Sequence, residues 1–209
     1  MNFEILYSDA DIAVIKKPAG IISEGQKDDG KSAPWLISSA LTERGITVRE
    51  VLTVHRLDQK TQGLMVFALS ARAAAALSRD IAEQKLQKTY TATVHGRPEL
   101  DEGELRDLLF FDRKRGKSFV VDRERKGVKE ALLKYRLLKY DQAANTSKLE
   151  IELLTGRTHQ IRVQFASRGM YLVGDRRYGA PAGNFDLTSK RIEFPHPKTG
   201  EIMTFEISE

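Results

Sequence analysis

The stretch from His55 to Ser70, HRLDQKTQGLMVFALS, joins a polar turn to an apolar strand. The turn carries His55, Arg56 and Asp58, and the run from Leu64 to Leu69 is typical of a buried strand. Residues 51–54 predict another strand before the turn, and functional side chains often lie on loops that strands hold. Asp58 is therefore a candidate catalytic carboxylate, although an Asp that only caps the turn fits the same spacing.

The composition limits the chemistry that this chain can perform. With 209 residues it can bury a substantial core, and we expect one domain over residues 1–209. The absence of cysteine excludes disulfides, cysteine-ligated zinc and a thiol nucleophile. The four histidines lack metal-ligand spacing, and no glycine-rich phosphate loop or dinucleotide motif occurs, so we expect no metal and no cofactor.

The sequence contains no segment that is typical of a membrane protein or a secreted one. The first residues, MNFEILYSDAD, are acidic where a signal peptide would be basic. No apolar run approaches the roughly 18–20 residues that span a bilayer. We therefore expect a cytoplasmic location and no membrane partner. We also expect a monomer.

Positive charge is concentrated in two segments, although the net charge is only +5. Residues 104–140 hold 12 Lys and Arg against 6 Asp and Glu, and residues 155–178 hold 5 Arg against one acid. Such segregation favours a polyanionic partner such as RNA. A basic face that is merely solvated fits the same counts.

Hydrophobic periodicity predicts many short strands and few helices. A hairpin is expected over 3–7 and 12–16, and another over 191–205. Ser32 and Ser70 are expected to cap helices, the first over 33–44. Further strands are expected at 88–94, 131–140 and 148–154, the first with Tyr90 on its apolar face. The pattern indicates an α+β fold with a large, mainly antiparallel sheet.

Two basic features stand out along the second half of the chain. Residues 106–126 predict two strands joined by a basic tip, which contains Arg113, Lys114, Arg115 and Lys117 and could reach a phosphate backbone. Farther on, Thr158 is the expected N-cap of a helix, and Arg157 before it would form an anion site beside the helix amides. A surface ion pair of Arg157 with Glu152 or a similar acid is the alternative.

Several motifs together resemble the RluA-type RNA pseudouridine synthases. His55–Asp58 followed by Thr61, Gly63 and Leu64 is similar to the family's HRLD..TSGLL signature. Residues 88–96, KTYTATVHG, and 155–163, TGRTHQIRV, match further motifs in the family's order. Lys17–Gly20 and the region 173–179 extend the resemblance over almost the whole chain.

The resemblance implies the pseudouridine synthase fold, with a mixed sheet flanked by helices and loops, and a role for each motif. Asp58 would be the catalytic carboxylate, Arg157 would pair with it and keep it ionised, and Tyr90 would stack on the target uracil. Arg56 would fill the gap left by a flipped uridine in rRNA or tRNA. The same motifs imply RNA contacts by His159 and Arg162.

Departures and alternatives remain at this point. Gln62 replaces the family's usual serine, and Lys16 replaces a usual asparagine, which concerns loop details only. The pattern starts directly with the catalytic domain, so no S4-type RNA-binding domain is expected. A catalytically inactive RNA-binding protein on the same fold is one alternative, and a nucleoside hydrolase is another, although glycosidases usually pair two carboxylates.

Overall fold

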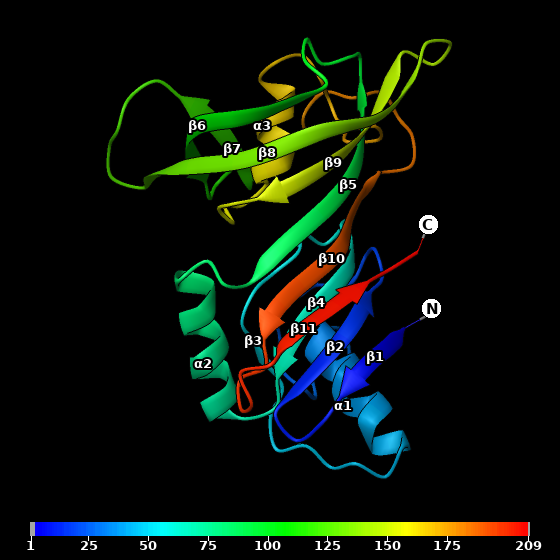
Figure 1. Ribbon diagram of the computed structural model, residues 1–209, viewed down its shortest axis with the longest axis vertical. Coiled ribbons are helices and arrows are strands. Elements are labelled where there is room, and N and C mark those ends of the chain that lie inside the picture. Colours follow the sequence, from blue (N-terminus) through cyan, green and yellow to red (C-terminus); the bar gives the residue numbers. More distant parts are fainter. Residues whose placement is uncertain (1–2, 209) are drawn as a thin grey trace. The chain divides into compact units, whose positions relative to one another are not determined.

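Strand β4 (Gln62–Ala68) follows the HRLD turn and is the most deeply buried strand near it, because Leu64 to Ala68 are all fully buried. The computed structural model describes residues 3–208, and the chain divides into two compact units, residues 1–88 with 188–209 and residues 89–187 (Figure 1). In the first unit β4 pairs along its length with antiparallel β2 (Ile12–Lys17). Both faces of β4 are covered, which explains its uninterrupted apolar sequence.

The opposite edge of β4 is shared by two strands. Antiparallel β3 (Leu52–Thr53) pairs with its last two residues, and parallel β10 (Leu187–Pro195) pairs with its first two. Gly63 is required at the β10 end, because it has φ +116° and an added Cβ would lie 2.2 Å from the Ser189 carbonyl oxygen. The polar turn therefore ends where two backbones approach closely.

The remaining elements of the first unit confirm the predicted hairpins and caps. They are β1 (Glu4–Ser8), β11 (Ile202–Glu206), α1 (Ala33–Glu43) and α2 (Ala71–Ala82). Strand β1 pairs with β2 and β11 with β10, both antiparallel. The hydroxyls of Ser32 and Ser70 accept the N–H groups of Trp35 and Ala73 as N-caps.

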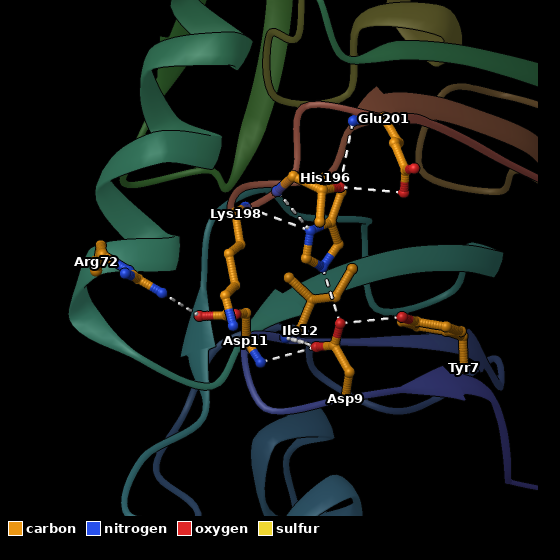
Figure 2. Close-up of polar contacts among 9 residues, drawn as sticks. Tyr7, Asp9, Asp11, Ile12, Arg72, His196, Lys198 and Glu201 are labelled. Carbon is orange, nitrogen blue, oxygen red and sulfur yellow. Dashed lines mark hydrogen bonds and ion pairs between the residues drawn. The ribbon is translucent and has the colours of Figure 1, made fainter.

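A polar cluster connects the two hairpins of this unit (Figure 2). The Asp9 carboxylate accepts hydrogen bonds from the Tyr7 hydroxyl (3.0 Å) and the Ile12 N–H (2.8 Å). Its Oδ2 also lies 2.8 Å from Nε2 of the buried His196, in the β10–β11 turn. The cluster holds the β1–β2 turn against the β10–β11 turn.

The second unit is an antiparallel sheet in the order β5-β9-β8-β6-β7. Its elements are β5 (Gln87–His95), β6 (Glu102–Asp112), β7 (Lys117–Val121), β8 (Val128–Asp141), β9 (Thr146–Leu153) and α3 (Gln160–Ala166). Leu109 and Ala131 from the sheet pack with Val163 from α3 and with Tyr178. The three predicted strands and the basic tip between β6 and β7 are confirmed.

The prediction that Thr158 caps the last helix is wrong. Helix α3 starts at Gln160, and its N-cap is His159, which has left-handed backbone angles (φ 56°) and no capping side chain. The side chain of Gln160 accepts the Arg157 N–H (3.0 Å), while the Thr158 carbonyl accepts the Ser118 hydroxyl (2.5 Å). A local side chain, Gln160, and a distant one, Ser118, thus take the place of the expected Thr158 cap in this turn.

The predicted fold class, an α+β fold with a large and mainly antiparallel sheet, is confirmed. Among the helices within residues 3–208, none is long and apolar enough to cross a membrane.

Candidate active site

The loop between β3 and β4 presents Asp58 on a tight turn. The Asp58 carbonyl accepts the Thr61 N–H at 3.0 Å, which closes the turn three residues later. Asp58 is half-buried between the buried Leu57 and the exposed Gln59. The carboxylate therefore stands between the core and solvent, a position suited to a reacting group.

The segment from Pro18 to Ser23 holds this loop on both sides of Asp58. The Ser23 hydroxyl donates to the Leu57 carbonyl (2.7 Å) and accepts the Leu57 N–H (3.1 Å). On the other side, the Gly20 N–H donates to the Gln59 carbonyl at 2.8 Å, and the Gln59 side chain donates to the Gly20 carbonyl at 2.9 Å. The backbone around Asp58 is thereby fixed before any substrate arrives.

Lys17 is the residue of this site whose role the sequence analysis missed. Its side chain is fully buried, and Nζ donates to the carbonyls of Pro18 (3.0 Å) and Ile21 (2.8 Å), with Gln59 farther away at 3.4 Å. Burial lowers the pKa of Lys17 from 10.5 to about 8, and the Asp58 carboxylate acts in the opposite direction. At neutral pH Lys17 therefore places a buried positive charge beside the Asp58 turn.

A signal for Lys17 was present in the sequence. The two-residue period of β2 places Lys17 on the same face as Ala13 and Ile15, which are both fully buried. A lysine in that position must bury its ammonium group and find acceptors for it. Its acceptors are loop carbonyls, which no pattern in the sequence indicates.

His55 fills the gap between β3 and β10 along the edge of β4. Its Nε2 accepts the Val66 N–H at 3.1 Å. Val66 is the β4 residue next to Phe67 and Ala68, which pair with β3. Nδ1 therefore carries the ring proton, and it has no hydrogen-bond partner within residues 3–208. Burial lowers the pKa of His55 from 6.5 to about 3, and the charge of Lys88 acts in the same direction.

His55 is expected to make the protein sensitive to acid. Its pKa is lower in the folded than in the unfolded state, so the unfolded chain binds more protons between pH 6.5 and about 3. As the pH decreases through that window, the free energy of unfolding should fall, with a slope approaching 1.4 kcal/mol per pH unit. Denaturant unfolding at several pH values measures this slope.

Replacement of His55 by Gln keeps an acceptor for the Val66 N–H but removes the titration. Between pH 3 and 6.5, the slope of the unfolding free energy against pH should then decrease by the contribution of about one proton. His95→Gln, at a half-exposed position on β5, is the matched histidine-to-glutamine control away from the edge of β4. Equal slopes for His55→Gln and the wild type would contradict a neutral His55 in the folded protein.

Tyr90 and Arg157 belong to the second unit. Tyr90 lies on β5 opposite Ile151 of β9, and only 4% of it is exposed, as the alternation predicted. Arg157 is half-buried, and its Nε donates to the Glu130 carbonyl at 2.8 Å. The main chain of β8 thus directs this guanidinium, and the alternative pair with Glu152 is not among the ion pairs found within residues 3–208.

His159 and Arg162 surround Tyr178. Nδ1 of His159 lies 3.0 Å from the Tyr178 hydroxyl, and the rings meet edge to face. Arg162 is 4% exposed and forms a bidentate ion pair with the fully buried Asp175, with distances of 2.7 and 2.8 Å. This pair satisfies both charges inside the second unit, and the RNA contact expected of Arg162 stays a prediction.

The predicted basic tip is a tight turn over Arg113–Gly116. The Asp112 carboxylate accepts the N–H groups of Lys114 and Arg115 and so shapes the turn. Arg113, Lys114 and Arg115 are exposed, whereas the Lys117 ammonium lies 4.8 Å from the centre of the Tyr178 ring. Three of the four predicted cations can thus meet solvent or a phosphate.

Of the predicted site residues, Asp58 and Arg56 lie in the first unit, on one loop. The others lie in the second unit: Tyr90, Arg113, Lys114, Arg115, Lys117, Arg157, His159 and Arg162. Within residues 3–208, no group of three or more His, Asp or Glu side chains is arranged to hold a metal ion.

Comparison with known proteins gives a consistent result. The family described as RNA pseudouridylate synthase matches residues 11–167. An uncharacterized RNA pseudouridine synthase of Aquifex aeolicus is 36% identical and covers 98% of this chain and 69% of its own. The dual-specificity RNA pseudouridine synthase RluA of Escherichia coli is 33% identical, and the match covers 97% of this chain and 91% of RluA.

The fold also matches solved structures. The human RNA pseudouridylate synthase domain containing 4 has a TM-score of 0.79 and 20% identity, over 98% of this chain and 87% of the other. The human RNA pseudouridylate synthase domain containing 1 has the same TM-score and 22% identity, over 100% of this chain and 84% of the other.

Proposed function

The chain belongs to the RNA pseudouridylate synthase family, an isomerase family, and on that premise we propose that it converts uridines of rRNA, tRNA or both into pseudouridine with Asp58 as the catalytic carboxylate. The observation that carries the proposal is the fixed Asp58 turn, gripped at Leu57 and Gln59 and backed by the buried charge of Lys17. One catalytic domain over residues 1–209 performs the reaction.

The reaction needs one carboxylate and no metal or redox group. The bond between ribose C1′ and uracil N1 breaks with its electron pair going to N1, the base rotates, and C1′ bonds to C5. C5 then loses a proton and N1 takes one up, so that the product is an isomer of the substrate. Asp58 attacks or stabilises the sugar carbon and must be ionised to do so. Lys17 supplies a buried positive charge that interacts with this carboxylate.

We assign Tyr90 and Arg157 the roles that the family resemblance implies. Tyr90 stacks on the target uracil, and its hydroxyl handles the proton at C5. Arg157 supports the ionised form of Asp58. The Nε donor bond to Glu130 leaves the terminal nitrogens of Arg157 to interact elsewhere.

Arg56 is placed to respond to the RNA. A uridine must leave its stack to react, which costs a few kcal/mol. Arg56 is exposed and pairs with Glu24 at 2.7 Å, with 59% of each side chain exposed. Such a pair is weak, so Arg56 can leave Glu24 and fill the gap in the RNA.

Purified protein incubated with rRNA and tRNA transcripts tests the proposed function. Uridine carrying tritium at C5 releases its label when C1′ bonds to C5, and we expect release from at least one transcript. An inactive RNA-binding protein would bind the RNA and release none. Binding without release on all transcripts would thus favour the alternative.

The basic tip should contribute to binding and leave the chemical step unchanged. Replacing Arg113, Lys114 and Arg115 by Gln removes three exposed cations. Affinity should fall, and the salt dependence should flatten by roughly 0.7–0.9 log units for each RNA phosphate that the tip no longer neutralises. Filter binding at several salt concentrations measures both quantities.

The matched control replaces Lys134, Arg136 and Lys139, which are exposed on β8, by Gln. It changes the net charge equally but should alter the salt slope less. If the tip variant bound normally and instead reacted slowly in single turnover at saturating RNA, the tip would have a role in chemistry.

A further inference from the structure

We infer that Ser23, in the loop between β2 and α1, is a positioning residue for the catalytic carboxylate. The inference rests on the proposed function of Asp58. Ser23 is 5% exposed, and its hydroxyl both donates to and accepts from the backbone of Leu57. One side chain therefore satisfies both polar groups of the residue that precedes Asp58.

These two bonds fix the backbone that enters the Asp58 turn. The Leu57 N–H belongs to the peptide before Leu57, and the Leu57 carbonyl belongs to the peptide that links it to Asp58. Holding both groups fixes the planes of both peptides. Leu57 is itself 5% exposed, so without Ser23 a buried N–H and a buried carbonyl would lose their partner.

The backbone at Ser23 is itself fixed by hydrogen bonds to other elements of the first unit. Its carbonyl accepts the Thr53 hydroxyl of β3 at 3.2 Å. The preceding residue, Ile22, forms a β-bridge with Ser32, and its carbonyl accepts the Ala33 N–H at 2.9 Å at the start of α1. The backbone that carries the Ser23 hydroxyl is thus bonded to β3 and to the N-terminus of α1.

The grip is completed on the far side of Asp58. Gly20 and Gln59 exchange two hydrogen bonds, so residues 57 and 59 are both attached to the 18–23 segment and Asp58 lies between them. Rates depend steeply on placement, since a shift of about 1 Å can cost a hundredfold. Ser23 thereby sets where the Asp58 carboxylate stands without touching the substrate.

The test compares Ser23→Ala with Ser147→Ala. Ser147 is a buried serine on β9 whose hydroxyl donates to the Gly96 carbonyl at 2.7 Å, so the control removes a similar bond away from the Asp58 loop. The single-turnover rate at saturating RNA should fall roughly ten- to a hundredfold in Ser23→Ala. RNA affinity and the pH dependence of the rate should stay unchanged, and Ser147→Ala should react at the wild-type rate.

An isosteric pair separates positioning from folding. Ser23→Thr and Ser23→Val differ only by a hydroxyl in place of a methyl group, and only Thr can bond to Leu57. We expect Thr to react at least about tenfold faster than Val at temperatures where both are folded. Equal rates for the pair, or a wild-type rate for Ser23→Ala, would overturn the inference.

Asp58→Asn, assayed alongside, separates this outcome from a failure of the proposed function. An inactive Asp58→Asn protein with a fully active Ser23→Ala protein would reject only the role of Ser23. An active Asp58→Asn protein would instead reject Asp58 as the catalytic group.

Discussion

Replacing Asp58 by Asn should lower the single-turnover rate of pseudouridine formation at least about a thousandfold, equivalent to roughly 4 kcal/mol in barrier. Asn has the same shape but cannot supply a negative charge to the sugar carbon. The fold should survive, because the bonds that hold the turn are made by the backbone of Leu57 and Gln59. RNA affinity should be unchanged or tighter, since the substitution removes a negative charge facing a polyanion.

Tritium release and RNA binding measured on the same protein check this expectation. Asp28→Asn, an exposed carboxylate in the neighbouring loop, is the control and should retain the wild-type rate. A rate for Asp58→Asn within about tenfold of the wild type, roughly 1.4 kcal/mol, would show that another group performs the chemistry.

Lys17→Met should be the next most damaging substitution. It removes the buried positive charge that interacts with the Asp58 carboxylate, so we expect the rate at neutral pH to fall roughly ten- to a hundredfold, about 1.4–2.7 kcal/mol. The carbonyls of Pro18 and Ile21 also lose a donor, and stability should decrease. Lys16→Met, which changes the adjacent β2 residue, is the control and should alter the rate little.

The pH profile distinguishes the charge of Lys17 from its structural contribution. Because its pKa is about 8, the wild-type rate should fall above pH 8 as Lys17 loses its proton. Lys17→Met should lack this alkaline limb.

The contribution of Lys17 to the free energy of unfolding should rise above pH 8, whereas the rate falls there. The unfolded chain binds more protons than the folded chain between pH 8 and 10.5, so this group's contribution to the free energy of unfolding rises across that window. Loss of activity without loss of stability would exclude alkaline unfolding as the cause. A wild-type rate that is flat to pH 9.5 would refute the role of Lys17.

Much of the fold could be predicted because its signals are local. Ser32 and Ser70 cap the helices as expected, since an N-cap bonds to amides only three residues away. The strand alternation placed Tyr90, Ala92 and Val94 on a buried face, because side chains of a strand alternate with period two. The expected cap at Thr158 failed where the partners come from Gln160 and from the distant Ser118.

The sequence by itself determined the family, the fold class and Asp58 as the candidate carboxylate. Motifs and hydrophobic periodicity depend on residues that are close together in the sequence, and they indicate which side chains react and which are buried. Only the tertiary structure decided how the Asp58 turn is supported. Lys17, Ser23 and His55 each bond to backbone groups of another segment, up to 42 residues away for Lys17 and Gln59. A carbonyl or an N–H is common to almost every residue type, so the sequence of the partner carries no mark of such a bond.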